Sequence, residues 1–178
     1  MALSVDSNPP ASGFDDALSL SLRQMAHNTS QMASMSIAAI VEVLGGAKTF
    51  RQRVRTSDDL AGQVRSGLPA STIDLLAGTL SLHRAQVAER LSIPARTLSR
   101  RLATHSRLTH EESDRTLRMA RVVALAREVL GSGEKASHWL NSPNRALSGR
   151  RPFDLLDTDL SVRSVEEVLQ RIAYGVYS

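Results

Sequence analysis

Apolar residues recur every three or four positions along most of the chain, which is the spacing of one buried helix face. The first such segment runs from Met32 to Leu44 and stops at Gly45-Gly46, because glycine commonly ends a helix. Further segments with this spacing predict helices over 57–65, 70–80, 82–91, 95–104, 109–130, 133–141 and 161–174. The pattern therefore predicts several short helices and one long helix over 109–130.

Local signals mark the ends of several predicted helices. Ser81 is a residue type that caps helix starts, so we expect it to cap the helix over 82–91. Thr109 and Glu112 have the spacing of a capping box at the start of the long helix, and Gly131 is expected to end it.

Strand-like alternation is confined to Phe50–Val54, so at most one short strand is expected there. The fold class predicted for the chain is all-α. Residues 1–30 are rich in Ser, Asn and Asp, contain a Pro-Pro pair and show little periodicity. We expect them to form a flexible N-terminal arm.

Composition supports a helical, soluble, cytoplasmic protein. The chain has one Trp, two Tyr and three Phe, so its core must consist of Leu, Val, Ile and Ala. It has no cysteine, which excludes disulfides, thiolate nucleophiles and cysteine-based zinc sites. No apolar stretch approaches the length of a membrane span, and acidic residues stand near the start where a signal peptide would be basic. No membrane partner is expected.

Catalytic and metal-binding motifs are missing from the sequence. The five histidines form no i, i+4 pair, and Gly45-Gly46 lacks the other residues of a phosphate-binding loop. Asp154, Asp157 and Asp159 resemble a carboxylate cluster, but the glycine turn and distal glutamate of a calcium loop do not follow them. We therefore expect no enzyme activity, no metal and no cofactor.

Positive charge is concentrated in one part of the chain. Residues 84–107 hold six basic and one acidic side chain, residues 1–83 hold six and seven, and residues 108–178 hold ten of each. Such a local excess is expected where a protein meets phosphates, although a solvated helix face would look the same by charge alone.

The pattern inside this stretch distinguishes these two interpretations. "RAQVAERLSIPARTLSRRL" has the form of a helix-turn-helix over about 82–104. Val87, Leu91, Ile93 and Leu98 occupy the positions that lock the two helices, and Ala88 is the small residue where they cross. Two residues depart from the usual pattern. Ser92 stands where glycine is common, and Arg101 stands where an apolar residue is common, with Leu102 expected to replace it.

A helix-turn-helix places the outer face of its second helix in the major groove of double-stranded DNA. A plain helical hairpin with solvated arginines is the alternative. Because one such unit buries little surface on DNA, we expect a homodimer that reads two half-sites. The candidate DNA-binding residues are His83, Gln86, Ala95, Arg96, Thr97, Ser99, Arg100 and Arg101.

Several segments together resemble antitoxins of the Xre/MbcA/ParS type over roughly residues 44–178. They are "GLPASTIDLLAGTLSLHRAQVAERLSIPARTLSRRL", "LTHEESDRTLRMARVVALAREVLG", "EKASHWLNSPNRALSGRRPFDLLDT" and "VEEVLQRIAYGVYS". The resemblance implies a type II toxin–antitoxin module whose toxin is usually a RES-domain protein related to ADP-ribosyltransferases, which uses NAD. It also implies that residues 109–178 bind the toxin and close its active site, while the helix-turn-helix represses the shared operon. We expect residues 31–108 to form the dimerisation and DNA-binding region.

The toxin-binding candidates lie in the C-terminal region, whose charges balance, and they include residue types common at interface hot spots. They are Arg150, Arg151, Asp154, Tyr174 and Tyr177. Within "RRPFDLLDT", Pro152 fits the first position of a helix and Asp154 its first turn, and Asp157 or Thr158 is expected to cap the next turn. The alternative function is a stand-alone helix-turn-helix repressor whose C-terminal region only dimerises or senses a ligand.

Overall fold

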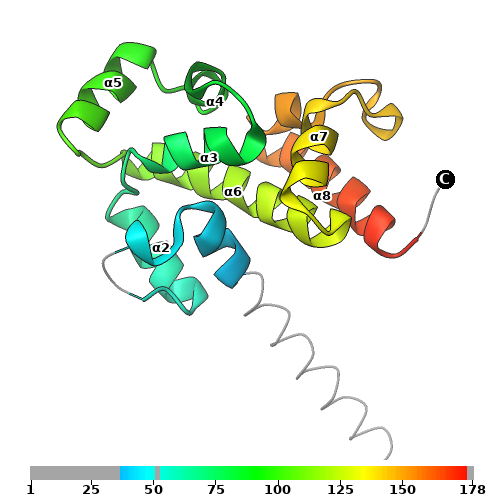
Figure 1. Cartoon of the computed structure of the whole chain (residues 1–178), viewed down its shortest axis with the longest axis horizontal. Helices are drawn as coiled ribbons and strands as arrows, with labels where there is room; N and C mark the ends of the chain where they lie inside the picture. The colour runs from blue at the N-terminus through cyan, green and yellow to red at the C-terminus, as the bar shows by residue number, and fades with distance from the viewer. Residues whose placement is uncertain (1–36, 51–52, 176–178) are drawn as a thin grey trace, which may run out of the picture. The chain divides into compact units, whose positions relative to one another are not determined.

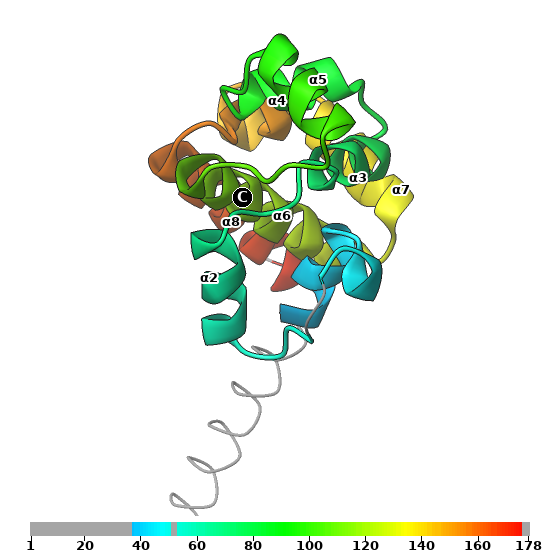
Figure 2. The same ribbon diagram turned by 90° about the vertical axis from the view of Figure 1, so that its left-hand side faces the viewer.

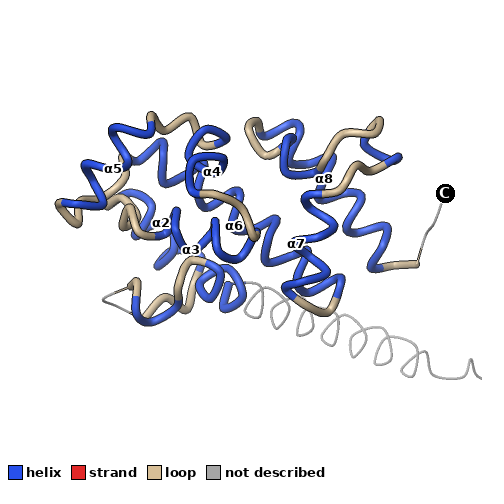
Figure 3. The backbone as a smooth tube through the Cα atoms, turned by 45° about the horizontal axis from the view of Figure 1, so that its top comes forward, coloured by secondary structure: helices blue, strands red, loops and turns tan. Residues whose placement is uncertain are grey.

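The computed structural model of the chain describes residues 37–50 and 53–175, and within these ranges it contains helices and loops but no strand (Figure 3). The all-α prediction is confirmed. The helical segment 37–43 comes first, and it is followed by η1 (Gly46–Lys48), α2 (Ser57–Arg65), α3 (Thr72–Leu80), α4 (Arg84–Arg90), α5 (Ala95–Ala103), α6 (His110–Leu130), α7 (Gly133–Asn141), η2 (Arg145–Leu147), η3 (Pro152–Leu155) and α8 (Asp159–Ala173).

Helix α6 runs through the middle of the described residues (Figure 1). It packs against α2 and α3 and also against α7 and α8. Met119, Ala120, Val122, Val123 and Ala126 are all buried, so the buried positions extend well beyond one stripe. A helix that is apolar on most sides must be surrounded by other elements, and α6 therefore forms the common core of the described residues.

The predicted ends of α6 are confirmed. The side chain of Thr109 accepts a hydrogen bond from the Glu112 amide, and the Glu112 carboxylate accepts one from the Thr109 amide at 2.7 Å. Gly131 ends the helix with φ 78°, in the left-handed region. Thr158 caps α8 by accepting from the Ser161 amide, which answers the choice between Asp157 and Thr158.

The expected role of Ser81 is wrong. Helix α4 begins two residues later than predicted, with His83 at its N-cap position. Ser81 instead ends α3 in the left-handed conformation, with φ 54°. The amide of the next residue, Leu82, donates back to the Ala77 carbonyl at 2.9 Å. Backbone hydrogen bonds thus close the C-terminus of α3, and the Ser81 hydroxyl does not cap a helix.

The segments before α2 contribute to the same core. Ile40, Val43, Leu44 and Phe50 are buried. Ile40 and Leu44 belong to the apolar spacing predicted for the first helix, so that prediction is confirmed for these two residues. Arg53 and Val54 lie in irregular backbone, so the short strand expected at 50–54 is not present in its described part. The expected arm over 1–30 and the predicted helix start at Met32 lie outside the described residues.

Hydrogen bonds from α7 satisfy the last carbonyl of α3. Ser137 Oγ donates to the Leu80 carbonyl oxygen at 2.7 Å, and Asn141 Nδ2 donates to the same oxygen at 2.8 Å. Ser137 and Leu80 are both buried. Because a buried carbonyl without a partner is destabilising, these bonds fix the end of α3, and so the start of the helix-turn-helix, on α7.

Ser92, in the turn between α4 and α5, has φ 56° and thus lies in the left-handed region. The usual helix-turn-helix motif has glycine at this position. The left-handed backbone conformation explains this preference, because glycine adopts it more readily than other residues. We predict that Ser92→Gly raises the free energy of unfolding by about 1 kcal/mol, since glycine reaches this conformation without strain. Urea denaturation of the purified chain measures the change.

The matched control is Ser99→Gly in the interior of α5. There glycine should lower the free energy of unfolding by roughly 0.5–1 kcal/mol, because it removes helix propensity without relieving strain. Equal destabilisation by both substitutions would contradict the account of Ser92.

Candidate functional site

Helices α4 and α5 and the turn between them form the predicted helix-turn-helix (Figure 2). Val87, Leu91, Ile93 and Leu98 are each at most 2% exposed, which confirms their expected locking positions. The Ile93 amide donates to the Ala88 carbonyl at 2.8 Å, so the turn is also closed through the backbone.

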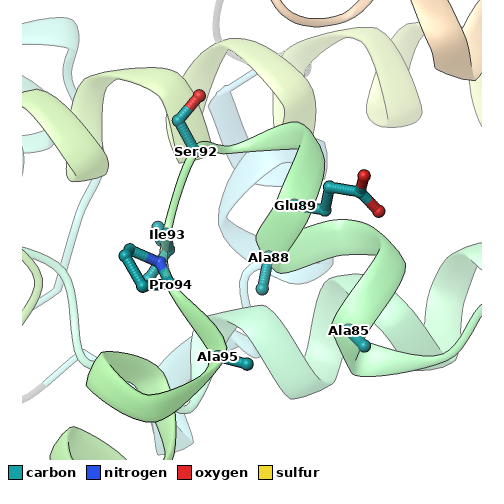
Figure 4. A pocket seen from close by; sticks show the side chains of 7 residues that line it. All are labelled: Ala85, Ala88, Glu89, Ser92, Ile93, Pro94 and Ala95. Atoms are coloured by element: carbon teal, nitrogen blue, oxygen red, sulfur yellow. The ribbon is translucent and has the colours of Figure 1, made fainter.

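Small side chains line the angle between the two helices. Ala85, Ala88 and Ala95 face this angle, with Ile93 and Pro94 at its base (Figure 4). Together they border an open hollow of about 450 Å³. Ala88 itself is 1% exposed, so a larger side chain there would push against α5, as expected for the crossing residue.

Helix α5 presents two different faces. Arg96, Ser99, Arg100 and Ala103 are exposed, and the helical repeat places them on one side. Leu98 is buried and Leu102 packs against the core, which confirms the expected inward role of Leu102. The outer face of α5 is therefore polar and basic.

Arg101 does not lie on that outer face, and the expectation that it would be exposed there is wrong. Its guanidinium forms an ion pair with Glu112, and the side chains of the two residues are 16% and 10% exposed. The helical repeat turns Arg101 toward α6. Thr97, on the same side, is half-buried.

Glu112 has two functions at this position. Burial alone would raise the pKa of its carboxyl group, but the hydrogen bond from the Thr109 amide and the pairing with Arg101 outweigh burial and lower it. Glu112 thus stays ionised, caps α6 and holds the inner side of α5.

The remaining DNA-binding candidates lie at the helix starts. His83 and Gln86 are exposed at the beginning of α4, where Gln86 Oε1 accepts from the His83 amide at 3.0 Å. Ala95 is exposed at the first position of α5. Gln86 therefore helps to cap α4, while its position on the surface remains accessible.

Ion pairs neutralise half of the basic residues in 84–107. Arg84 pairs with Asp74 at 2.5 Å, Arg90 with Asp154 at 3.2 Å, and Arg101 with Glu112. Within the described residues, Arg96 and Arg100 make no ion pair. The positive excess on the helix-turn-helix is thereby focused on the outer face of α5.

The "RRPFDLLDT" segment contains the predicted helix start, because Pro152 is the first residue of η3. The Asp154 carboxylate accepts two hydrogen bonds from Arg151, at 2.7 and 2.9 Å, and one from Arg90 at 3.2 Å. The Arg90 guanidinium also lies over the Phe153 ring, 5.7 Å from its centre. These contacts attach η3 to α4 of the helix-turn-helix.

This network changes the set of candidate partner contacts. Hydrogen bonding to Asp154 raises the pKa of Arg151, and both oxygens of Asp154 are already occupied within the chain. Asp154 therefore has a structural role within the chain, and its contact with a toxin stays a prediction. Arg150 and Tyr174 are exposed, Tyr174 at 80%, whereas Tyr177 lies outside the described residues. Leu155 and Leu156 are buried.

One candidate contact escaped the sequence analysis. Leu160, in the first turn of α8, is 79% exposed although it is a large apolar residue. It borders a groove of about 270 Å³ together with Leu147, Arg150 and Ser164. The sequence signal was present, because Leu160 falls outside the inward stripe of α8 that contains Val162, Val165 and Leu169.

Two further findings concern membrane-spanning helices and metal sites. No helix in the described part of the chain is long and apolar enough to cross a membrane. The described residues also contain no group of three or more His, Asp or Glu side chains arranged to hold a metal ion.

Two protein-family models match adjacent parts of the chain. Residues 59–121 match the "Antitoxin Xre-like helix-turn-helix domain", and residues 125–175 match the "Antitoxin Xre/MbcA/ParS C-terminal toxin-binding domain". The two matches meet inside α6. All described residues belong to one compact unit, which shows no division at 108/109. The domain boundary predicted there therefore stays a prediction.

Curated relatives agree with these matches. A protein named Antitoxin Xre from Yersinia enterocolitica is 32% identical over 67% of this chain and 81% of its own length. Another Antitoxin Xre, from Pseudomonas putida, is 42% identical over 47% of this chain and 52% of its own length. A Sphingobium protein named "Prs ADP-ribosylating antitoxin" is 28% identical over 67% of this chain and 81% of its own length.

The network around Asp154 leads to a stability prediction. Asp154→Ala should lower the free energy of unfolding by about 1.5–3 kcal/mol, because it removes hydrogen bonds to charged groups that are partly buried and leaves Arg90 without its closest carboxylate. Asp157→Ala is the matched control. Asp157 is 48% exposed and 4.0 Å from Arg90, so its loss should change stability by less than about 1 kcal/mol. Equal effects in urea denaturation would contradict a structural role for Asp154.

Proposed function

Because the chain belongs to the family of Xre antitoxins, which are toxin-neutralising proteins and not enzymes, we propose that it silences a RES-domain toxin by covering its active site. We further propose that it binds the operator of the shared operon and represses transcription. The observation that carries the proposal is the continuity of a helix-turn-helix and a toxin-binding domain through one compact unit.

The name of one relative supports the proposed toxin class in addition to the sequence resemblance. The name of the Sphingobium relative associates that protein with ADP-ribosylation, a reaction that consumes NAD⁺. A RES-domain partner that uses NAD agrees with this association. The antitoxin itself holds no cofactor in this proposal, since its part is to occlude the partner's active site.

The proposed toxin-binding surface centres on the groove beside Leu160. An exposed leucine next to a hollow can insert into a partner, and the neighbouring Arg150 can supply charge-assisted hydrogen bonds. Tyr174, at the other end of α8, extends the surface. The hydrogen bonds between Arg151 and Asp154 stabilise η3, which lies next to this surface in the sequence.

The proposed DNA-binding surface is the outer face of α5, with Arg96 and Arg100 as its main charges. Ser99 and Ala95 lie on the same exposed side of the helix, and His83 and Gln86 are placed to meet the flanking phosphates. A homodimer would bring two such faces to two half-sites of an operator.

Removing the two charges tests the DNA-binding proposal. Arg96→Ala combined with Arg100→Ala should weaken operator binding and reduce the slope of log affinity against log salt by about 2, because two phosphate contacts fewer release fewer counterions. Fluorescence anisotropy over a salt series measures both quantities. Neutralisation of the toxin in the same variant should be unchanged.

The matched control is Arg163→Ala combined with Arg171→Ala, which removes two exposed charges from α8. It should leave the salt slope nearly unchanged. A similar loss of DNA affinity in both double variants would mean that net charge, and not the face of α5, governs binding.

Changing Leu160 tests the toxin-binding proposal. Leu160→Asp should weaken toxin binding by about 2 kcal/mol or more, roughly 30-fold, because a charge would replace an apolar anchor. Leu160→Met keeps the apolar side chain and should retain binding. Co-expression with the neighbouring toxin gene provides the readout, since growth should recover with the wild type and with Leu160→Met but not with Leu160→Asp.

Because Leu160 is 79% exposed, both variants should fold, and circular dichroism verifies this. Full rescue by Leu160→Asp would overturn the proposed surface. Failure of the wild-type chain to rescue growth or to co-purify with the toxin would overturn the antitoxin function and favour the stand-alone repressor.

A further inference from the structure

A second basic site lies beside the helix-turn-helix, outside its exposed face. It is a cleft of about 550 Å³ between η1, the start of α3, the start of α4 and the end of α5. Four segments that are distant in sequence thus contribute to one hollow. Its charged and titratable lining residues are Lys48, Asp74, Arg84, Arg101, His105 and Arg107.

The cleft has more positive than negative charge. Asp74 is its one acidic lining residue and is already paired with Arg84 at 2.5 Å. Arg101 is balanced by Glu112. Lys48 makes no ion pair or side-chain hydrogen bond within the described residues, and Arg107 donates only to the Gly67 carbonyl, at 2.5 Å. Two cations therefore remain without an acidic partner there.

The lining also supplies neutral donors. Thr49, Ser71 and Ser106 border the same hollow as Lys48 and Arg107. Arginine, lysine and hydroxyl groups that converge in a concave site are the usual ligands of a phosphate group, since they provide both charge and directed hydrogen bonds. Walls of low dielectric concentrate the field of such charges.

We propose that this cleft binds a phosphate group. The phosphate can come from the DNA backbone beside the recognition surface or from a free phosphate compound, and both sources share the same chemistry. Arg101 and Leu102 line the cleft from the inner side of α5, whereas Arg96 and Arg100 lie on the outer side. A phosphate in the cleft therefore lies next to the α5 face and not on it. The DNA source rests on the proposed operator binding, and the free source does not.

Charge reversal at Lys48 gives the sharpest test. Lys48 is exposed at the end of η1, so Lys48→Glu should fold normally. A second variant adds Arg107→Gln. The control is Lys135→Glu, which reverses an exposed charge on α7, away from the cleft. Thermal unfolding of all full-length variants verifies that they fold.

Two measurements separate the sources. Isothermal titration of the full-length chain with pyrophosphate tests a free ligand, and the salt dependence of operator binding tests the DNA backbone. For a free ligand, we expect pyrophosphate to bind the wild type and Lys135→Glu with similar affinity. Its affinity for the double variant should be lower by a factor of about ten or more. For the backbone, we expect Lys48→Glu to lower the salt slope by about 1, with no change for Lys135→Glu.

Either result supports the phosphate site and identifies its source. The proposal is overturned if pyrophosphate does not bind, or binds the double variant as tightly as the wild type, and the salt slopes of Lys48→Glu and Lys135→Glu both equal that of the wild type. It is also overturned if the wild type binds neither ligand. Failure of the operator proposal is distinguishable, because loss of DNA binding by the wild type leaves the pyrophosphate titration informative.

Discussion

The burial of helix α6 is the constraint on which the rest of the structure depends. Its middle is apolar on most sides, with Met119, Ala120 and Val122 buried among their neighbours, so it is stable only when other helices surround it. Helices α2 and α3 cover one part, and α7 and α8 cover another. The two regions matched by different family models are therefore joined through one shared core helix and not through a linker.

Polar contacts then fix the helix-turn-helix relative to the C-terminal region. Ser137 and Asn141 bind the last carbonyl of α3, and Asp154 binds Arg90 of α4. Glu112 adds a third attachment by pairing with Arg101 of α5. Each of these groups is at least partly buried, so breaking one leaves an unsatisfied polar partner. The outer face of α5 and the surface around Leu160 consequently belong to one compact unit.

Much of this fold could be predicted from the sequence, because the deciding signals were local. The capping box of Thr109 and Glu112, the apolar spacing of α6 and the locking residues around Ala88 act within a few positions of one another. The errors concern non-local partners. The pairing of Arg101 with Glu112 depends on the packing of α5 on α6, and that of Asp154 with Arg90 joins residues 64 positions apart. Leu160 was missed because the inward stripe of α8, and not its outward residues, dominated the pattern.

We propose that two separate surfaces of one compact unit bind DNA and toxin. Helix α5 and the C-terminal part of α8 lie toward opposite sides of the described residues (Figure 1). The most direct measurement is to add operator DNA to the purified antitoxin–toxin complex and to follow its mass by size-exclusion chromatography with light scattering. We expect a single species that contains DNA, antitoxin and toxin. Release of the toxin on addition of DNA would contradict it, because the two ligands would then compete for one surface.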